Sequence, residues 1–482
     1  MGLVWRIALE EWRYWQRSKL GLIALLTLLV LLLATIFSTA QRMTTETAQR
    51  EHFQVTAEST FRDQPARHPH RMVHYGHYVT RVPSPLSIID PGIDPYAGTI
   101  IFLEGHRQNS AAFSPRYSSA QAGPFTELTP ALVYQILVPL LLVFVGFSII
   151  SREREAGTHL LLLTMATTPL QLWLGKVLAL VGVGLITLIP LVACLFYTFI
   201  VGENGLICLT FFAGYALYLL FWVLLVCCIS TLVNRSSLSL SALLVIWLLF
   251  CAIIPKLASS TVDAVVPLDG KVARDLEVVK ALREVGDGHN ANDPAFKQLR
   301  AQLLEQHNVS SLEELPFNFR GRIAQLAEAE LTDIINGFAK VQQQQEKNQA
   351  RIVHWFGVLS PALATRSFSV VTAGTDLNNL HLFLQGAESL RFEFVQRLNA
   401  LHELNLAYSD DINRSKDAES EQRTRVDAAN WQLLDNFHHH GTPVSQRLFQ
   451  SLPHILILLL WILVVAVVGV VNISRLSRAN NG

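Results

Sequence analysis

Charged side chains are scarce in this sequence. Asp, Glu, Lys and Arg make up 16% of the 482 residues, whereas roughly a quarter is usual for a soluble protein. The deficit is uneven, because long runs without any charge alternate with stretches as polar as a soluble helical domain. The 38 acidic and 38 basic residues balance, and no Lys/Arg cluster stands out, which argues against nucleic acid as a partner.

Cysteine is equally sparse. All five cysteines lie in apolar runs, namely Cys194, Cys208, Cys227, Cys228 and Cys251. The polar stretches therefore fold without disulfides, even if they face an oxidising compartment. No Cys-x-x-Cys pair occurs, which excludes the usual thiolate zinc and redox motifs.

Nucleotide-binding and hydrolytic motifs are also missing. No G-x-x-x-x-G-K-[ST] phosphate loop is present, because Gly175-Lys176 lacks both the upstream glycine and the following Ser or Thr. No Ser/His/Asp set, paired carboxylates or nucleophile elbow stands out. We expect no catalysis and no bound cofactor on this chain by itself.

What the sequence has instead is long charge-free runs. A bilayer core of ~30 Å needs about 20 apolar residues in a helix. Six segments qualify, and none contains Asp, Glu, Lys or Arg: Leu20–Thr39, Pro130–Ile150, Val177–Ile200, Leu206–Val233, Leu238–Ile254 and Pro453–Val471. The first exceeds the usual apolar core of a signal peptide, so we expect it to be retained.

Basic residues in the short connections predict the orientation. With the N-terminus inside, the cytoplasmic pieces carry ten of them: Arg6, Arg13, Arg17, Lys19, Arg152, Arg154, Lys176, Arg235, Arg475 and Arg478. Both termini are then cytoplasmic, with residues 1–19, 151–176 and 472–482 inside and residues 40–129 and 255–452 outside. In a bacterial cell the chain would be a multi-pass protein of the inner membrane with a large periplasmic domain.

The larger outer segment has helical patterns. Asp293-Pro294 predicts a helix start leading into Ala295–His307, and either Ser310 with Glu313 or Ser311 with Glu314 has capping-box spacing. Apolar residues at helical spacing predict one long helix to about Trp355 and another after Thr375. The smaller segment is broken by prolines, has a short β-type run, Thr99–Leu103, and is expected to pack on the larger one. The predicted fold class is an all-α membrane protein with a mostly helical extracytoplasmic domain built from two insertions.

Two cytoplasmic pieces are candidates for contact with a soluble partner. After the second span comes "SREREAGT", whose candidate coupling residues are Arg152, Glu153, Arg154, Glu155, Gly157 and Thr158. The N-terminal piece has a Trp-rich apolar face opposed by arginines, with Arg6, Trp12, Arg13 and Trp15 as its characteristic residues, a pattern typical of helices in the headgroup plane of membrane lipid. The alternatives are an ordinary charged loop and a simple surface anchor.

The text "EREAGT", followed by a leucine-rich stretch, Pro169 and Gly175-Lys176, resembles ABC-2 type permeases, the transmembrane subunits of type V ABC exporters. The resemblance implies that residues 151–176 are a coupling helix docking on a separate nucleotide-binding subunit, which holds ATP and Mg, and that residues 1–19 are the family's amphipathic connecting helix. It also implies a second permease chain, often an identical one. The large outer segments depart from the core family and resemble a subgroup with external insertions.

Histidines raise the question of a metal site. Fifteen of the 16 lie on the outer side or its edge, including His68, His70, His74 and His77. Imidazole ligates copper and zinc. No carboxylate or thiolate lies at a fixed spacing from them, however, and a proline-containing loop does not fix ligand geometry. The sequence therefore predicts exposed or hydrogen-bonded histidines rather than a metal site.

Two functions fit these features. The first is export of a substrate out of the cytoplasm or the inner membrane, driven by a partner ATPase. The second is mechanical transmission, in which the spans move the outer helical bundle against a periplasmic partner protein and no cargo crosses. Spans without Asp, Glu, Lys or Arg disfavour proton coupling or an ion channel.

Overall fold

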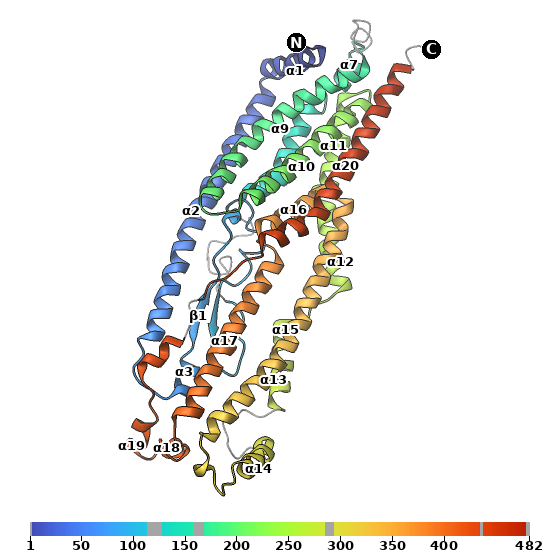
Figure 1. Cartoon of the computed structure of the whole chain (residues 1–482). Helices are drawn as coiled ribbons and strands as arrows, with labels where there is room; N and C mark the ends of the chain where they lie inside the picture. Colours follow the sequence, from blue (N-terminus) through green and yellow to red (C-terminus); the bar gives the residue numbers. More distant parts are fainter. Residues whose placement is uncertain (1, 113–127, 159–167, 285–293, 434–436, 479–482) are drawn as a thin grey trace.

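The computed structural model describes residues 2–112, 128–158, 168–284, 294–433 and 437–478. The molecule is elongated and mostly helical, with α1 and the C-terminal part of α20 at one end and α14, α18 and α19 at the other (Figure 1). Six helical stretches are long and apolar enough to span a membrane: Leu20–Arg62, Pro130–Glu155, Pro169–Ile200, Gly205–Leu232, Ser236–Val265 and Val444–Ser474. They confirm the prediction of a helical protein with six spans.

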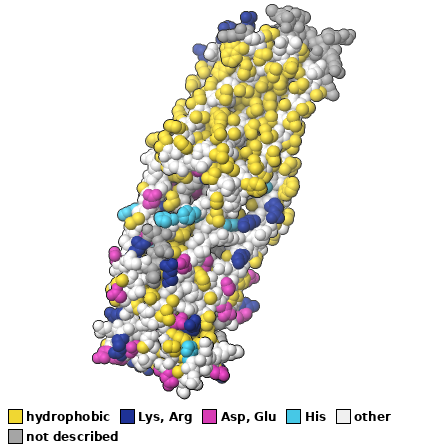
Figure 2. Space-filling model, in the orientation of Figure 1, with side chains coloured by type: hydrophobic (Ala, Val, Ile, Leu, Met, Phe, Trp, Pro, Cys, Tyr) yellow, Lys and Arg dark blue, Asp and Glu magenta, His cyan; other side chains and the backbone are white. Residues whose placement is uncertain are grey.

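The surface divides into two halves. Figure 2 shows hydrophobic side chains covering the half near α1, which we call the apolar half, while charged side chains gather over the other, polar half. An apolar surface of this extent is unfavourable in water and suits lipid hydrocarbon.

The apolar half is built around α10. Helices α9, α20 and α6 pack on it, and its own buried side chains include Tyr215, Tyr218 and Trp222. Leucines of α2 such as Leu22 and Leu26 are exposed, as expected for a peripheral span that faces lipid. The elements of this half are α1 (Leu3–Ser18), α2 (Leu20–Arg62), α5 (Pro130–Leu132), η2 (Val133–Leu137), α6 (Val138–Gly146), α7 (Ser151–Glu155), α9 (Pro169–Ile200), α10 (Gly205–Leu232), α11 (Ser236–Leu248), η3 (Leu249–Ile253) and α20 (Val444–Arg478).

Several helices run beyond the predicted spans. Helix α2 continues through residues 40–62, where an irregular segment was expected, and α12 extends the fifth span past Ile254. Hydrophobicity ends at these points, but helix propensity does not, because no proline or glycine follows Thr39 before Pro65. Helix α9 begins at Pro169, so residues 169–176 belong to the third span's helix and not to a separate coupling helix.

A proline shapes the second span. Pro139 has no N–H, and the π-helical turn η2 precedes it. The carbonyl of Gln135, four residues earlier, instead accepts a hydrogen bond from the Tyr218 hydroxyl at 2.7 Å. Helix α10 therefore supplies the donor that the proline removes.

The fifth span also has a π-helical turn before a proline, and again a hydroxyl from another element bonds to a carbonyl of that turn. Its π-helical turn η3 precedes Pro255, and the carbonyl of Phe250 accepts from the Ser360 hydroxyl at 2.7 Å. Ser360 is also the N-cap of α16 (Pro361–Ala373), a short helix buried between α10 and α20. The start of α16 is thus fixed to the irregular turn of the span.

The polar half contains helices from both insertions and a two-stranded antiparallel sheet. Long helices α15 and α17 pack against each other, and α12 and α13 line α15. Its elements after α2 are α3 (Pro69–Tyr75), β1 (His77–Thr80), η1 (Pro85–Ile88), β2 (Ile100–Leu103), α12 (Ile254–Val265), α13 (Lys271–Arg283), η4 (Pro294–Phe296), α14 (Lys297–Gln306), η5 (Leu312–Glu314), α15 (Phe319–Leu359), α17 (Leu377–Asn405), α18 (Tyr408–Asn413), α19 (Ala418–Arg423) and η6 (Ala428–Leu433).

The two insertions share one core, as the sequence suggested. Phe61 of α2 and Met72 of α3 are buried against Phe394 of α17, and the Phe61 and Phe394 rings meet edge to face at 5.2 Å. Buried apolar side chains of the sheet, including Val79, lie on Phe383 of the same helix. Each of these two clusters therefore needs side chains from both insertions.

Burial of His77 makes this core sensitive to acid. His77 is 2% exposed beside the Phe61 ring, and burial, with the charge of Arg62, lowers the pKa of its imidazole to about 4. Since the pKa in the unfolded chain is about 6.5, the neutral imidazole stabilises the fold above that pH, and this contribution is lost as the pH falls toward 4.

Unfolding of the protein in detergent between pH 7.5 and 5 should therefore show a loss of about 1–3 kcal/mol from this residue. The variant His77→Phe removes this ionisable group and should make the pH profile less steep, although other histidines whose pKa is lowered by burial, such as His68 and His439, keep their contributions. The same change at His52, which is exposed on α2, should leave the profile unaltered. An equally steep profile for His77→Phe would contradict the assignment.

Candidate functional site

Helix α1 lies against the beginning of α9. Two glycines of α9 permit the close approach: a Cβ at Gly175 would lie 2.6 Å from the Cβ of Ile7, and one at Gly182 would lie 3.1 Å from the Trp12 ring. Lys19, with φ at 57°, separates α1 from α2. The two helices thus meet through backbone-close packing, and a side chain at Gly175 would push them apart.

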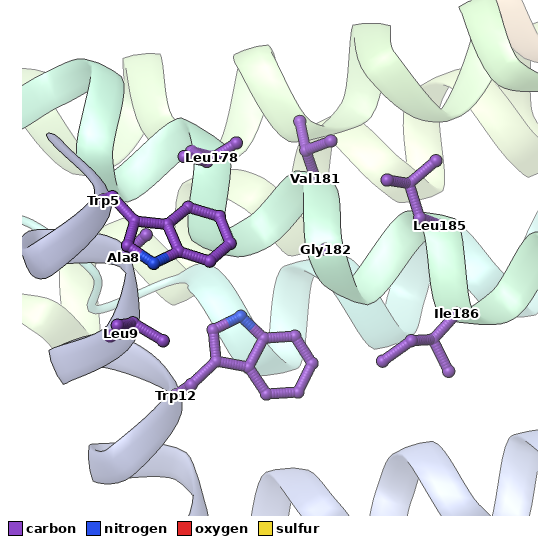
Figure 3. A pocket seen from close by; sticks show the side chains of 9 residues that line it. All are labelled: Trp5, Ala8, Leu9, Trp12, Leu178, Val181, Gly182, Leu185 and Ile186. Atoms are coloured by element: carbon purple, nitrogen blue, oxygen red, sulfur yellow. The ribbon is translucent and has the colours of Figure 1, made fainter. Parts of the chain in front are cut away.

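The four N-terminal candidates divide between the two faces of α1, as the pattern predicts. Trp15 is buried and Trp12 is half-buried, whereas Arg6 and Arg13 are exposed. The apolar face, expected to lie in lipid headgroups, packs largely on protein. Beside the contact lies a small apolar groove (Figure 3), lined by Trp5, Ala8, Leu9, Trp12, Leu178, Val181, Gly182, Leu185 and Ile186.

A cluster of four charges joins α1, α7 and α9. Glu11 of α1 is 3% exposed and Lys176 of α9 is 2% exposed. Arg152 of α7 donates from Nη2 to both carboxylate oxygens of Glu11 at 2.8 Å. The Lys176 ammonium donates to Glu11 at 2.5 Å and also pairs with Glu153 of α7. We call Glu11, Arg152, Glu153 and Lys176 the junction cluster.

The junction cluster is balanced, with two carboxylates and two cations. Buried charges are stable only while each remains paired, because an unpaired one keeps its full desolvation cost. Arg152 also lies over the Tyr14 ring, 3.8 Å from its centre, in cation–π geometry. The cluster therefore ties three separate elements into one unit that is costly to pull apart.

The remaining charges of α7 bind the turn between α10 and α11. Arg154 donates to the carbonyls of Thr231 and Val233 at the C-terminal end of α10. Glu155 accepts from the backbone N–H of Ser236, the first residue of α11, at 3.0 Å. A cation at a helix C-terminus and a carboxylate at an N-terminus both complement the helix dipoles.

Beyond Glu155 the chain turns outward. Ala156, Gly157 and Thr158 are exposed, and we call them the tip. Gly157 has φ at 70°, a left-handed conformation that ends α7, and a Cβ added there would meet no heavy atom within 4 Å. Residues 159–167 of the expected coupling helix lie outside the described residues. The tip is therefore the exposed end of the described segment.

All six candidates lie on α7 or directly after it. Four of them bond to other parts of the chain, and Gly157 and Thr158 lie in the exposed tip. Glu153 and Glu155, expected to face a partner, make internal contacts, as do Arg152 and Arg154. The sequence-based candidates did not include Glu11 or Lys176, although Lys176 belongs to the motif that carries the resemblance. The available signal was the position of Glu11, which shares a helical face with Ala8 and Trp15 although it is charged.

The four histidine candidates lie in three different parts of the structure. His70 and His74 lie together on α3, and His106 joins them. His68 is buried beside Asp411 and His402, and His77 lies in the core described above. The expected proline-containing loop is wrong in part, because Pro69 occupies the first turn of α3, where proline favours a helix start.

Comparison with known families divides the chain near the end of the fifth span. The family described as ABC-2 family transporter protein matches residues 5–277. A family described as a domain of unknown function, DUF3526, matches residues 275–440, which cover most of the polar half. A search of curated proteins gave no match. The first match includes α1, the junction cluster and the tip, and it covers more than half of the chain.

Proposed function

Since the chain belongs to the ABC-2 family of transporter proteins, we propose that it is the permease subunit of an ATP-driven exporter. Family membership makes it a multi-pass membrane protein and implies a nucleotide-binding partner. In our proposal that partner is a separate ATPase chain, which holds ATP and Mg, and two copies of the permease form the membrane part.

The proposed orientation puts α1, α7 and the tip in the cytoplasm and the polar half outside, in the periplasm of a bacterium. It is supported by the arginines on and near α1 and α7, such as Arg6, Arg13 and Arg17. The single observation that carries the proposal is an exposed tip whose supporting helix α7 is fixed to α1, α9, α10 and α11.

In the proposed mechanism, closure of the ATPase dimer pushes on the tip. Because α7 is too short and too firmly bonded to bend alone, the push passes through the junction cluster to α1 and α9, and through Arg154 and Glu155 to α10 and α11. The spans then change their packing and open a path for the substrate. The apolar runs within the spans contain no Asp, Glu, Lys or Arg, which suits an amphipathic or lipid-like substrate better than an ion.

A bulky residue on the tip tests the docking role. Thr158→Trp should lower the amount of co-purified nucleotide-binding subunit at least about tenfold, a loss of about 1.4 kcal/mol in binding. Folding should be unaffected because the residue is exposed. Thr45→Trp, an exposed change on α2 in the polar half, is the matched control. Equal retention of the subunit by both variants would remove the docking role.

One observation favours the second candidate, mechanical transmission. Helices α2 and α11–η3–α12 run without a break from the apolar half into the polar half, and α20 begins at the boundary (Figure 1). At the boundary, Arg447 of α20 donates to both carboxylate oxygens of Glu203, at 3.0 and 3.1 Å. In this candidate, movement of the spans passes to the polar half along the continuous helices, and the Arg447–Glu203 pair holds the start of α20 to the turn between α9 and α10.

Reconstitution with the ATPase in vesicles separates the two candidates. The export proposal expects vectorial, ATP-dependent movement of a lipid, glycan, peptide or drug cargo. Transmission expects no cargo movement and an ATPase rate that responds to an added external protein. If ATP hydrolysis depends only on such a protein, the export proposal fails while the permease assignment stands.

A further inference from the structure

Helix α3 in the polar half presents two histidines on one face. Pro69 starts the helix, and His70 and His74, four residues apart, therefore lie one above the other. Their Nε2 atoms are 3.2 Å apart. Two ligands bound to one zinc ion at ~2.0–2.1 Å in a tetrahedral site are about 3.3 Å apart, so the pair already has the spacing of a chelate.

A third histidine comes from the turn after β2. Gly105 allows this turn to lie directly on α3, because a Cβ there would be 2.2 Å from Val73 Cγ1, and its N–H donates to the Val73 carbonyl at 3.2 Å. His106 follows with φ at 66°, a left-handed conformation that is uncommon for residues other than glycine. The ligand nitrogens of His70, His74 and His106 all lie within 4.8 Å of one another.

A buried carboxylate orients the third imidazole. Glu328 of α15 is fully buried, accepts the His106 backbone N–H at 3.1 Å and lies 3.1 Å from His106 Nδ1. It is fixed from the other side by Arg391. A carboxylate on one imidazole nitrogen favours the proton there and leaves the other nitrogen as a ligand, the arrangement that supports histidines in metal sites.

We propose that His70, His74 and His106 bind a divalent transition-metal ion of the zinc and copper class. Three imidazole nitrogens suit such borderline ions, whereas Mg²⁺ and Ca²⁺ prefer oxygen ligands. Three protein ligands also leave a coordination position open to water or to an external group. The site draws on both external insertions, because His106 and α3 belong to the first and Glu328 to the second. It does not depend on the transport proposal.

A second cluster nearby provides a contrast. His68, His402 and Asp411 are also close together, but each oxygen of Asp411 is already within hydrogen-bond distance of one imidazole, at 3.2 and 2.9 Å. Arg320 and Arg414 lie 3.8 and 3.6 Å from the same carboxylate. Two guanidinium groups beside a fully buried set disfavour a further cation, so this cluster is structural.

Metal titration of the full-length protein in detergent tests the site. After treatment with a chelator, the protein should bind one Zn²⁺ per chain in calorimetry, and Co²⁺ should give the visible absorption of a nitrogen-ligated site. His70→Gln and His74→Gln each remove a ligand and should weaken binding by about 100-fold or more, since even loss of an outer-shell partner costs about 10–100-fold. His52→Gln, an exposed histidine on α2, should bind as the parent does.

His106→Asn adds a variant that keeps a residue type tolerant of the left-handed conformation. It should also lose tight Zn²⁺ binding, while unfolding of the metal-free protein stays unchanged. If His106→Asn fails to fold, the His70→Gln and His74→Gln variants still test the site, because both of these histidines are at least partly exposed. No Zn²⁺ binding by the parent protein, or binding that both α3 variants retain, would overturn the proposal.

Discussion

Lys176→Met should both destabilise the apolar half and uncouple the ATPase. Removing this ammonium leaves Glu11 and Glu153 with Arg152 as the only remaining cation of the junction cluster. Breaking a buried ion pair from one side costs about 3–5 kcal/mol. We expect that loss in thermal unfolding in detergent, together with a fall of tenfold or more in ATP-dependent activity of the reconstituted complex.

A compensating change distinguishes charge imbalance from lost packing. In the double variant Lys176→Met with Glu153→Gln, one carboxylate and one cation remain, and Glu11 keeps both hydrogen bonds from Arg152. The double variant should recover part of the stability that the single variant loses. Glu10→Gln, which removes an exposed pair with Arg13, should cost less than about 1 kcal/mol. A double variant no better than Lys176→Met would show that the charge balance is unimportant.

Arg391→Met should weaken the packing of α15 against α17 in the polar half. Arg391 is 1% exposed and pairs with Glu328 of α15 and Glu388 of its own helix α17. Although burial alone would raise it, the hydrogen bond with His106 and the charge of Arg391 lower the pKa of Glu328 to about 2. Without the guanidinium, two buried carboxylates lose their main partner.

The expected cost is again about 3–5 kcal/mol, measured as earlier unfolding and faster proteolysis of α15 and α17. Arg397→Met on the same helix gives the matched control, because its pair with Glu393 is partly exposed and such pairs contribute about 1 kcal/mol or less. Equal stability of the two variants would show that the buried network does not hold α15 to α17.

Hydropathy predicted the spans well but not the helix ends. Charge-free runs identify the segments that lipid accepts, because a charge in hydrocarbon is costly. Helices end for other reasons, at caps, prolines and glycines, so α2 and α12 continue past the apolar runs. Lys176 was placed outside the third span for its charge, yet it is buried in α9 because Glu11 and Glu153 neutralise it.

For the histidines, the sequence showed which residues are close in the chain but not which of them meet in the fold. Sequence spacing placed four histidines close together, but only His70 and His74 share a helix face, because Pro69 sets where α3 begins. His106 is more than thirty residues away in the chain and reaches α3 through the pairing of β1 with β2. No local pattern contains a contact of that separation.

The sequence by itself determined the six spans, the two-faced N-terminal helix, the absence of a phosphate loop and the segment that carries the tip. These are local properties, since they follow from hydrophobicity, periodicity and short-range composition. Only the tertiary structure decided which charges meet in the junction cluster and which histidines converge, because those pairs come from distant segments, and helix packing selects them after each helix has formed.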